Sequence, residues 1–557
     1  MQLAQIALYW LAYGVIIGLV ALASIIFTYT YQSNRDRSAF VSIIIIISLT
    51  SLLATILLLP VDVALVSSTN SSRLGIKKEW ATPEKIQEIV SRLKIFYITL
   101  YSVDAALCLV IIPFTYFFYE EYDDVEAEEG HQTLAQRIFG ALKYTLMFTI
   151  LLLFIFLAGF LTPTVRNSKC SQFDLDFFRR LIIEDHGERA ITFSLGLLIS
   201  IGTILYTFFT ATGMAVLPLS LIKSQPTIDA SNLHTKSTNF LNENRERQRQ
   251  LQYRTIRNNH AEDHREHERL VNEERILIRR KNHAIKLHKY DNRPTVRILK
   301  KLENSLKPLK VIGGILLLCF SIIIWTSILV TGVDKAKNSL CQQECGYILN
   351  NMNIFQPLNY IFVECSKVFP LDNVVMVILT LFFLSSSVVG IVKIGIRFFW
   401  IKLLEIRKGR TLPQAMLIIT IILALIILAL NYSIVMMVVP HYATFGTQTF
   451  CDALENFPDG QPDCSMHPDL VKPCSELSPE HGRKNICTPS VISSALSRVI
   501  VNFKFYGAFL FWAQFSFLVV FLLAFIIQLF RRPEVDLRII DELAEIEEEE
   551  SLLGNQR

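Results

Sequence analysis

The stretch Asn242-Glu-Asn-Arg-Glu-Arg-Gln-Arg-Gln-Leu251 lies inside a polar segment that runs from Lys223 to Lys310. This segment holds 21 Lys and Arg residues against 11 Asp and Glu residues, so it carries +10, whereas the whole chain carries only +4. A segment of this charge does not cross a bilayer, and segments rich in Lys and Arg are strongly biased to the cytoplasmic side. The polar segment therefore fixes the topology of the hydrophobic segments before and after it.

The rest of the chain is apolar. Of 557 residues, 52% are hydrophobic and only 19% are charged, which is the composition of a polytopic membrane protein. Apolar runs of about 20 residues must satisfy their backbone hydrogen bonds inside lipid, and helices do so. Nine such segments lie at about 6–31, 39–66, 95–118, 141–162, 190–222, 311–332, 372–396, 412–439 and 505–530. The predicted fold is all-α, with about nine transmembrane helices, a long cytoplasmic helical insert between spans five and six, and disulfide-bearing luminal loops.

The spans divide around the polar segment. Residues 1–222 form a first bundle of five spans, 223–310 the basic cytoplasmic segment, 311–530 a second bundle of four spans, and 531–557 an acidic cytoplasmic tail. Luminal loops are expected at 333–371 and 440–504. This topology places the N-terminus in the lumen and the C-terminus in the cytoplasm, with 35 Lys and Arg residues in cytoplasmic segments and 19 in luminal ones.

The polar segment favours helix. Residues from about Asn239 to Tyr290 contain many good helix formers and Glu/Arg pairs at short spacing, and no Gly or Pro occurs before Pro294. We therefore expect one long helix there. Its basic charge favours anionic lipid headgroups or a protein partner, and the absence of an RNA-binding motif argues against nucleic acid.

The cysteines support the same topology. Two of the ten lie inside spans, and eight fall in loops assigned to the lumen or at their edge. These eight are Cys170, Cys341, Cys345, Cys365, Cys451, Cys464, Cys474 and Cys487. An even number on one side predicts disulfides in an oxidising compartment, with two bridges in the last luminal loop and the pairing left open. Asn70-Ser-Ser is a glycosylation sequon in a luminal loop.

Charged residues inside or at the ends of spans are the candidate substrate pathway. Asp104 lies near the middle of the third span, where a carboxylate must be protonated, paired or exposed to a cavity. Asp62 and Asp372 belong to two similar Pro-x-Asp units at the luminal boundary, which are either helix punctuation or a remnant of duplication. Lys393 and Arg397 lie four residues apart near the cytoplasmic end of the seventh span, and they either set topology or form a basic pocket for an anionic group.

The chain contains no Walker loop, no His-Glu-x-x-His and no nucleophile elbow, so we expect neither an enzyme nor a metal site. Without a Walker loop, ATP hydrolysis by this chain cannot drive transport. In the tail, Glu548 followed by Leu552 and Leu553 matches an acidic dileucine sorting signal of the kind that clathrin adaptors bind. This signal predicts an endosomal, lysosomal or vacuolar membrane.

Several blocks resemble the limb-region-type membrane protein family, most closely its lysosomal cobalamin transporter branch. They are Leu59-Pro-Val-Asp62, Ile112-Pro-Phe-Thr-Tyr-Phe-Phe-Tyr-Glu-Glu121, Ala141-Leu-Lys-Tyr-Thr-Leu146, Gly213-Met-Ala-Val-Leu-Pro-Leu-Ser-Leu-Ile-Lys223, Pro308-Leu-Lys310, Val368-Phe-Pro-Leu-Asp372 and the block from Gly395 to Ala415. The resemblance implies a nine-span protein of the lysosomal or vacuolar membrane that moves cobalamin from lumen to cytosol. It also implies an ATP-binding-cassette partner, and cobalamin as transported ligand rather than bound cofactor.

Two functions therefore compete. In the first, the chain transports cobalamin through a path lined by its intramembrane polar groups. In the second, the chain is a membrane scaffold, receptor or escort that binds a partner through the basic segment and is sorted by its tail.

Overall fold

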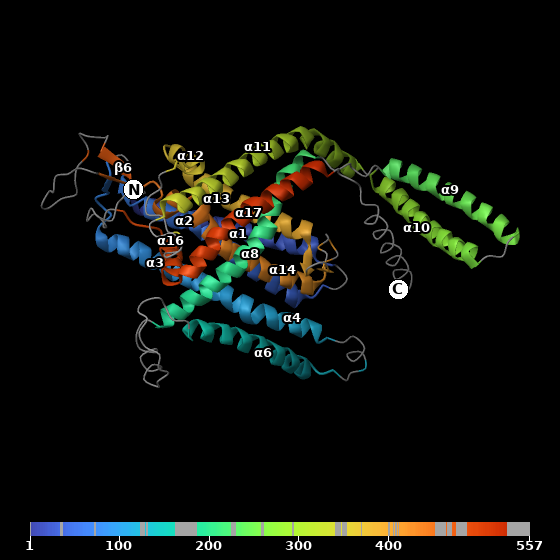
Figure 1. Ribbon diagram of the computed structural model, residues 1–557, viewed down its shortest axis with the longest axis horizontal. Helices are drawn as coiled ribbons and strands as arrows, with labels where there is room; N and C mark the ends of the chain where they lie inside the picture. Colours follow the sequence, from blue (N-terminus) through green and yellow to red (C-terminus); the bar gives the residue numbers. More distant parts are fainter. Residues whose placement is uncertain are drawn as a thin grey trace. The chain divides into compact units, whose positions relative to one another are not determined.

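The computed structural model describes residues 2–33, 37–71, 74–122, 129, 132–161, 186–223, 230–257, 261–291, 294–339, 347, 354–368, 370–398, 401–404, 406, 409, 411–451, 464, 470–474 and 487–531. Across these ranges the chain is mainly helical, and nine helical segments are long and apolar enough to cross a membrane (Figure 1). The predicted all-α fold with about nine spans is confirmed.

The spanning elements, in chain order, are α1 (Gln2–Tyr31), α2 (Ala39–Ser67), the continuous run of α3 (Pro83–Ala106), the π-helix η1 (Leu107–Ile111) and α4 (Ile112–Glu120), then α6 (Leu134–Leu161), α8 (His186–Ile222), α11 (Pro294–Asn338), α13 (Leu371–Ile394), α14 (Pro413–Ser433) with the π-helix η3 (Ile434–Val438), and α17 (Lys504–Phe530). The other helices are α9 (Ala230–Arg257), α10 (Ala261–Asp291), α12 (Pro357–Cys365), α15 (Pro440–Phe445) and α16 (Val491–Asn502). The six short strands are β1 (Asn70–Ser71), β2 (Ile76–Lys77), β3 (Ile396–Phe398), β4 (Ile401–Leu404), β5 (Thr449–Cys451) and β6 (Val471–Pro473).

The local sequence explains where these helices begin and where they contain π-helical turns. Ser38 caps α2, and Thr82 followed by Pro83 opens α3, which is the expected N-terminal pattern. The two π-helical turns each end shortly before a proline, at Pro113 and Pro440. Proline cannot donate a backbone hydrogen bond, and a π-turn is one way in which a helix accommodates that loss.

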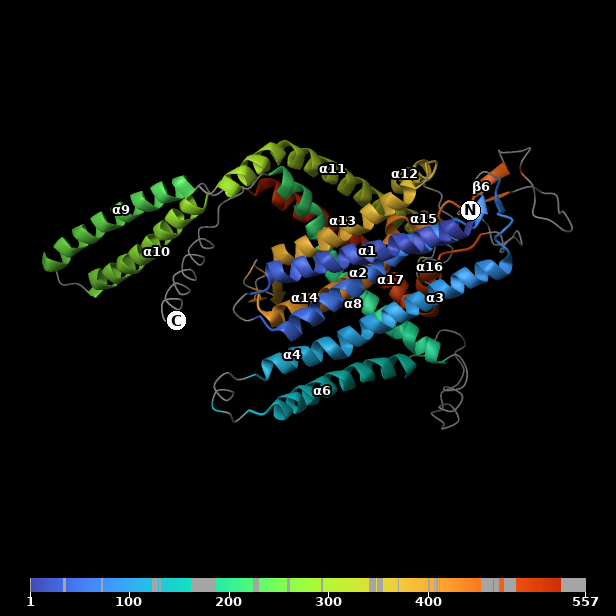
Figure 2. The ribbon, with the colours of Figure 1, turned by 180° about the vertical axis from the view of Figure 1, so that it is seen from behind.

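The chain divides into two compact units, which we describe separately. Unit 1 comprises residues 1–217 and 319–526, so spans from both sides of the polar segment pack together in it. The buried helix at its centre is α2, which contacts α1, α3, α13 and α14 (Figure 2). Apolar residues occur all around α2, so it is suited to contact several helices at once.

Glycines allow α8 to approach the later spans closely. A Cβ atom added at Gly213 would lie 1.7 Å from the backbone oxygen of Ser386, and one added at Gly390 would lie 1.9 Å from that of Phe209. Beside this crossing, the hydroxyls of Thr210 and Ser387 form a hydrogen bond of 2.8 Å. Small residues and hydroxyl pairs of this kind hold membrane helices together.

One end of unit 1 carries the strands β1, β2, β5 and β6, and we call it the disulfide end. Strand β1 pairs with β2 and β5 pairs with β6, both antiparallel, and β2 contacts β5. Disulfides join Cys451 to Cys464 and Cys474 to Cys487, with Cα–Cα distances of 5.8 and 5.9 Å. The two bridges predicted for this loop are confirmed, and the structure adds their pairing.

The remaining cysteine predictions have different outcomes. Cys365 in α12 is a free thiol in the described structure. Cys170, Cys341 and Cys345 lie outside the described residues, as does the predicted sorting signal Glu548, Leu552 and Leu553.

The opposite end of unit 1, which we call the β3–β4 end, is closed by the antiparallel pair β3 and β4. The segment after β4 is tied to the end of α1, because the Gly409 N–H donates to the Thr30 carbonyl and the Thr411 N–H to the Tyr31 carbonyl, at 2.9 and 3.1 Å. Gly409 adopts φ +71°, a backbone conformation that favours glycine.

Unit 2 comprises residues 218–318 and 527–557. The single helix predicted over 239–290 is wrong, because α9 and α10 are two helices that pack side by side (Figure 1). Their sparse apolar residues explain the result. Leu251, Leu270 and Leu277 are buried in this hairpin, whereas a single straight helix would expose them all to water. Arg245 and Glu274 add an ion pair of 2.8 Å between the two helices.

Candidate functional site

Asp104 is held between two helices. It projects from α3 toward α2, where the hydroxyls of Ser51 and Thr55 each donate a hydrogen bond of 2.6 Å to its carboxylate. Its side chain is only 8% exposed. A buried carboxylate is costly in a membrane unless it is paired or hydrogen-bonded, and two hydroxyls one helical turn apart supply that stabilisation here. The residue thus joins α3 to α2 whatever further role it has.

Tyrosine and asparagine side chains from neighbouring spans extend the polar group around Asp104. Tyr97 and Tyr101 stack one turn apart on α3, with ring centroids 6.1 Å apart. The Asn431 amide of α14 donates to the Tyr101 hydroxyl at 3.2 Å. On α1, the Tyr13 hydroxyl donates to the Ala54 carbonyl at 2.8 Å. Four spans therefore place polar side chains around Asp104.

Asp62 has a structural partner far away in the sequence. The backbone N–H groups of Val491 and Ile492 donate to its carboxylate at 3.3 and 3.2 Å. These groups belong to the first turn of α16, where a helix favours negative charge. Asp62 therefore fixes α16 to the end of α2.

Asp372 has a different environment, although its Pro-x-Asp unit resembles that of Asp62. It lies in the first turn of α13 and accepts a hydrogen bond of 2.8 Å from the Tyr442 hydroxyl of α15. Pro370 immediately precedes α13, whereas Pro60 lies inside α2. The two Pro-x-Asp motifs thus lie at different positions in their helices. This difference favours helix punctuation over a remnant of duplication.

The predicted pathway residues do not converge on one point. Asp372 and Lys393 lie at opposite ends of α13, separated by 21 residues or about 32 Å of helix. Lys393 is exposed in the last turn of α13. Arg397 lies in β3, in register with Lys402 of β4, and its side chain is outside the described part of the structure.

A second polar cluster, which sequence reasoning missed, surrounds η3. The Lys335 ammonium group of α11 donates to the Met436 carbonyl at 2.9 Å. The Gln356 amide donates to the Thr331 hydroxyl at 2.5 Å and to the Val438 carbonyl at 3.2 Å. A π-turn leaves carbonyls without regular helical partners, and these side chains satisfy two of them.

The same cluster contains a buried acid and a buried histidine. Asp334 is fully buried, and its Oδ1 accepts a hydrogen bond of 2.5 Å from Asn338. Its Oδ2 has no hydrogen-bond partner among the described residues. Burial lowers the pKa of His441 to about 4, and the nearby Asp334 carboxylate partly opposes this shift. Asp334, Lys335 and His441 therefore form a group of three ionisable side chains beside η3.

The sequence does not readily reveal this cluster, because its charged residues interrupt the apolar run of the sixth span. Asp334 and Lys335 interrupt the hydropathy pattern, so the predicted span stops at 332, whereas α11 continues to Asn338. Both residues lie one turn inside the helix end. A polar run that keeps helix-forming residues up to Asn338 could have indicated this extension.

Two further residues at this end are buried by the strands. The Lys77 ammonium group donates to the hydroxyls of Thr488 and Thr69 at 2.8 and 3.3 Å, and burial lowers its pKa to about 8. Asn70 is 5% exposed, and its side-chain amide donates to the Thr449 carbonyl at 2.9 Å. A glycan on Asn70 would have to replace that bond, and glycosylation of Asn70 stays a prediction.

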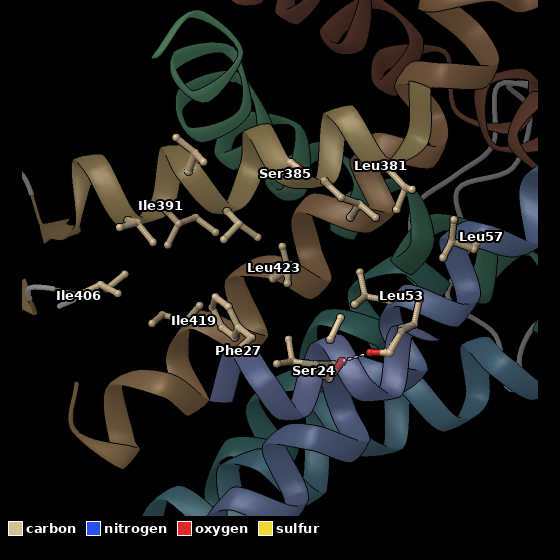
Figure 3. A pocket seen from close by; sticks show the side chains of 17 residues that line it. Ser24, Phe27, Leu53, Leu57, Leu381, Ser385, Ile391, Ile406, Ile419 and Leu423 are labelled. Atoms are coloured by element: carbon tan, nitrogen blue, oxygen red, sulfur yellow. Dashed lines mark hydrogen bonds between the residues drawn. The ribbon is translucent and has the colours of Figure 1, made fainter. Parts of the chain in front are cut away.

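The described residues hold no group of three or more His, Cys, Asp or Glu side chains that could bind a metal. The cavity in Figure 3 lies among α1, α2, α13 and α14 and measures about 390 Å³. Its lining is almost entirely aliphatic and aromatic. The polar groups described above lie outside it.

Comparison with known proteins assigns the chain to a family. The family model described as "LMBR1-like membrane protein" matches residues 10–308. A protein of Sclerotinia sclerotiorum named "Probable lysosomal cobalamin transporter" is 57% identical over 557 residues, which is 100% of this chain and 93% of that protein. Proteins of the same name from Podospora anserina and Pyrenophora tritici-repentis are each 51% identical, covering 99% and 100% of this chain and 93% and 95% of their own length.

No solved structure matches the chain. The family model and the relatives agree with the resemblance found in the sequence blocks. The chain belongs to the LMBR1-like membrane protein family.

Proposed function

We propose that this chain serves the export of cobalamin from the lumen of a lysosome or vacuole to the cytosol, as a non-enzymatic membrane protein. The observation that carries the proposal is similarity along the whole chain to proteins named as probable lysosomal cobalamin transporters. The nine spanning segments support a role in the membrane itself.

The proposed orientation places the disulfide end in the lumen. Disulfides persist in oxidising compartments, and both bridges lie at this end. Ile6 of α1 lines a small pocket with Leu65 and Trp80, so the start of α1 lies at the same end. The N-terminus is then luminal, and the tail with its dileucine pattern is cytoplasmic, where a clathrin adaptor binds it.

The conformation described here bears on how cargo would pass. Cobalamin is a large corrinoid with many amide groups, so its path needs a wide cavity with polar lining. Pockets for drug-sized ligands span about 300–1,000 Å³. The cavity of Figure 3, at about 390 Å³ with an apolar lining, fits neither the size nor the polarity of cobalamin. In the described conformation, this cavity is therefore not the path of cobalamin.

A second candidate function is that of an escort or scaffold for an ATP-binding-cassette transporter that moves the cobalamin. The observation favouring it is the α9–α10 hairpin of unit 2. Phe240 is 52% exposed and Tyr253 is 76% exposed on α9, and aromatic residues are enriched in protein interfaces.

Reconstitution separates the two functions. The purified full-length chain is placed in liposomes loaded with cobalamin, and efflux is followed with and without an ATP-hydrolysing transporter from the same membrane. Efflux from liposomes that hold only this chain supports direct transport. Efflux that appears only with the second protein and ATP assigns the escort function to this chain.

Two controls make the assay decisive. Liposomes with the ATP-hydrolysing protein alone measure what this chain adds, and non-hydrolysable nucleotide measures the need for hydrolysis. If neither arrangement exceeds protein-free liposomes, and the chain binds no cobalamin in detergent, the proposed function is wrong.

A further inference from the structure

The cavity among α1, α2, α13 and α14 is built for an apolar ligand. Four helices contribute to its lining, with Phe27 of α1, Leu53 of α2, Ile391 of α13 and Ile419 of α14 (Figure 3). The hydroxyl of Ser24, one of two serines in the lining, donates to the Val20 carbonyl of its own helix at 2.9 Å. The lining carries no charged side chain. A polar ligand would lose its hydration here without gaining partners, which excludes cobalamin as the occupant.

The cavity opens on the surface that these spans present to lipid. Leu381 lines it and is 44% exposed, and Ile378, one turn earlier on α13, is 50% exposed. On the other side, Leu22 and Ile26 of α1 are 54% and 57% exposed. Exposed side chains of this kind within membrane spans face acyl chains. The cavity is therefore continuous with the lipid-contacting surface.

The cavity is elongated along the helices, which is also the direction of the acyl chains in a bilayer. The lining residues of α13 extend from Leu381 to Val392, which is about 16 Å of helix. Ile406, in the segment tied by backbone hydrogen bonds to the end of α1, lines the cavity at the β3–β4 end. The cavity thus runs along the helices, and the part lined by Ile406 lies at the β3–β4 end.

Positive charge lies at that boundary. Lys393 follows the lining residue Val392 directly and is exposed. The β3–β4 pair begins two residues after α13 and brings Arg397 into register with Lys402. Basic residues at a membrane surface attract anionic lipid headgroups. An apolar cavity that ends beside such residues has the charge pattern of a phospholipid site.

We propose that this cavity binds one acyl chain of an anionic glycerophospholipid from the surrounding bilayer, with its headgroup beside Lys393 at the β3–β4 end. The bound chain fills the space that α1 and α13 leave between them. This site goes beyond cobalamin export and stands or fails independently of it.

Photo-crosslinking tests the site in the full-length chain. The purified protein is reconstituted in phosphatidylcholine nanodiscs that contain a small fraction of phosphatidylserine with a diazirine near the end of one acyl chain. After irradiation, mass spectrometry of peptides locates the label. We expect labelling concentrated on residues 20–27 of α1 and 381–392 of α13.

Substitutions that fill the cavity should remove this labelling. Val389 lines the cavity, and V389F should lower labelling about tenfold, because displacing about two methylenes forfeits their burial. Val374 lies on the same helix, is 47% exposed and does not line the cavity, so V374F is the matched control and should leave labelling unchanged. A23F fills the cavity from α1, so the test does not depend on one variant being well folded.

The headgroup is tested separately. K393Q should lower phosphatidylserine labelling about fivefold, the effect of one Lys near an anionic headgroup, and leave labelling by diazirine-phosphatidylcholine unchanged. The matched control is K143Q, an exposed Lys of α6 away from the cavity. Labelling spread evenly over the exposed faces of all spans, or unaffected by both V389F and A23F, would overturn the site. Equal labelling by the two lipids would overturn the anionic headgroup, and displacement of the label by cobalamin would reassign the cavity to cargo.

Discussion

The Asp104 carboxylate is buried between α3 and α2, and its stability depends on the Ser51 and Thr55 hydroxyls. Removing both donors leaves a buried charge without partners, which costs more than removing the charge. We therefore expect S51A/T55A to lower the free energy of unfolding by about 2–4 kcal/mol, and D104N by less. Thermal unfolding of the detergent-solubilised chain measures the difference.

Combining the changes gives the decisive comparison. Adding D104N to S51A/T55A should recover part of the lost stability, since the orphaned charge is then gone. If the triple variant is the least stable of all, the carboxylate does not depend on these hydroxyls. In the liposome assay, D104N with normal abundance and unchanged cobalamin efflux would exclude a pathway role for Asp104.

His441 predicts a specific pH dependence. Burial lowers its pKa from 6.5 to about 4, so between these values the unfolded chain binds a proton at this residue and the folded chain does not. Stability contributed by the neutral folded form is therefore complete above pH 6.5 and is lost as pH falls toward 4, by at most about 3 kcal/mol.

Replacing the imidazole should remove this contribution. H441Q should show a smaller fall in Tm between pH 7 and pH 4.5 than the wild-type chain. H234Q, which changes a histidine of α9 in unit 2, is the control and should retain the wild-type slope. Parallel Tm curves for H441Q and the wild-type chain would contradict the assignment.

These residues also show what the sequence could reveal about the site. A carboxylate in an apolar run must be stabilised, so the importance of Asp104 was predictable, but its partners depend on how α2 packs. Asp62 meets backbone groups 429 and 430 residues later, and no local pattern indicates such a contact. The cluster of Asp334, Lys335 and His441 is not predictable in this way, because charged residues usually mark the end of a span and here α11 continues beyond them.

At the scale of elements, the length of the apolar runs was enough to predict the spans. Long apolar runs have one structural solution in lipid, and all nine were predictable for that reason. The hairpin of α9 and α10 was not predictable, because its leucines are too sparse to show a heptad. Their burial is explained only by the packing of the two helices against each other. The close crossing of α8 with α13 was also hidden, since an isolated glycine in a helix has several explanations.

That crossing predicts a strong effect of small substitutions. A methyl group at Gly213 or Gly390 would overlap backbone atoms, which cannot move as a flexible side chain can. We expect G213A and G390A each to lower the free energy of unfolding by about 3 kcal/mol or more, at the upper end for overpacking. Size-exclusion chromatography after heating, with a fluorescent fusion, measures the surviving folded fraction.

The matched control uses the same change in a different place. Gly14 of α1 has no atom within 4 Å of an added Cβ, so G14A should be neutral or stabilising by up to about 1 kcal/mol through helix propensity. Equal losses for G14A and G213A would show that the α8–α13 approach is not tight.

At the scale of the whole molecule, two independent features define its sides. The polar segment supplies 21 of the 54 Lys and Arg residues and lies between the fifth and sixth spans. The disulfides lie at the end where α2 meets α16 and where Ile6 contributes to a pocket with Trp80. In the proposed topology, the nine spans found among the described residues place the two ends of the chain on opposite sides of the membrane. Charge and redox chemistry therefore favour the same proposed orientation, although neither argument depends on the other.

Protease protection in intact lysosomes or vacuoles tests this orientation. Epitope tags are placed at the N-terminus, between α9 and α10, and at the C-terminus of otherwise unchanged chains. External protease should remove the second and third tags and spare the first, because only the first lies in the lumen, and detergent should expose all three. A protected tag between α9 and α10 would invert the topology, and the disulfides would then face the reducing cytosol. Protection of that tag together with loss of the N-terminal tag would therefore contradict the charge and the redox arguments at once.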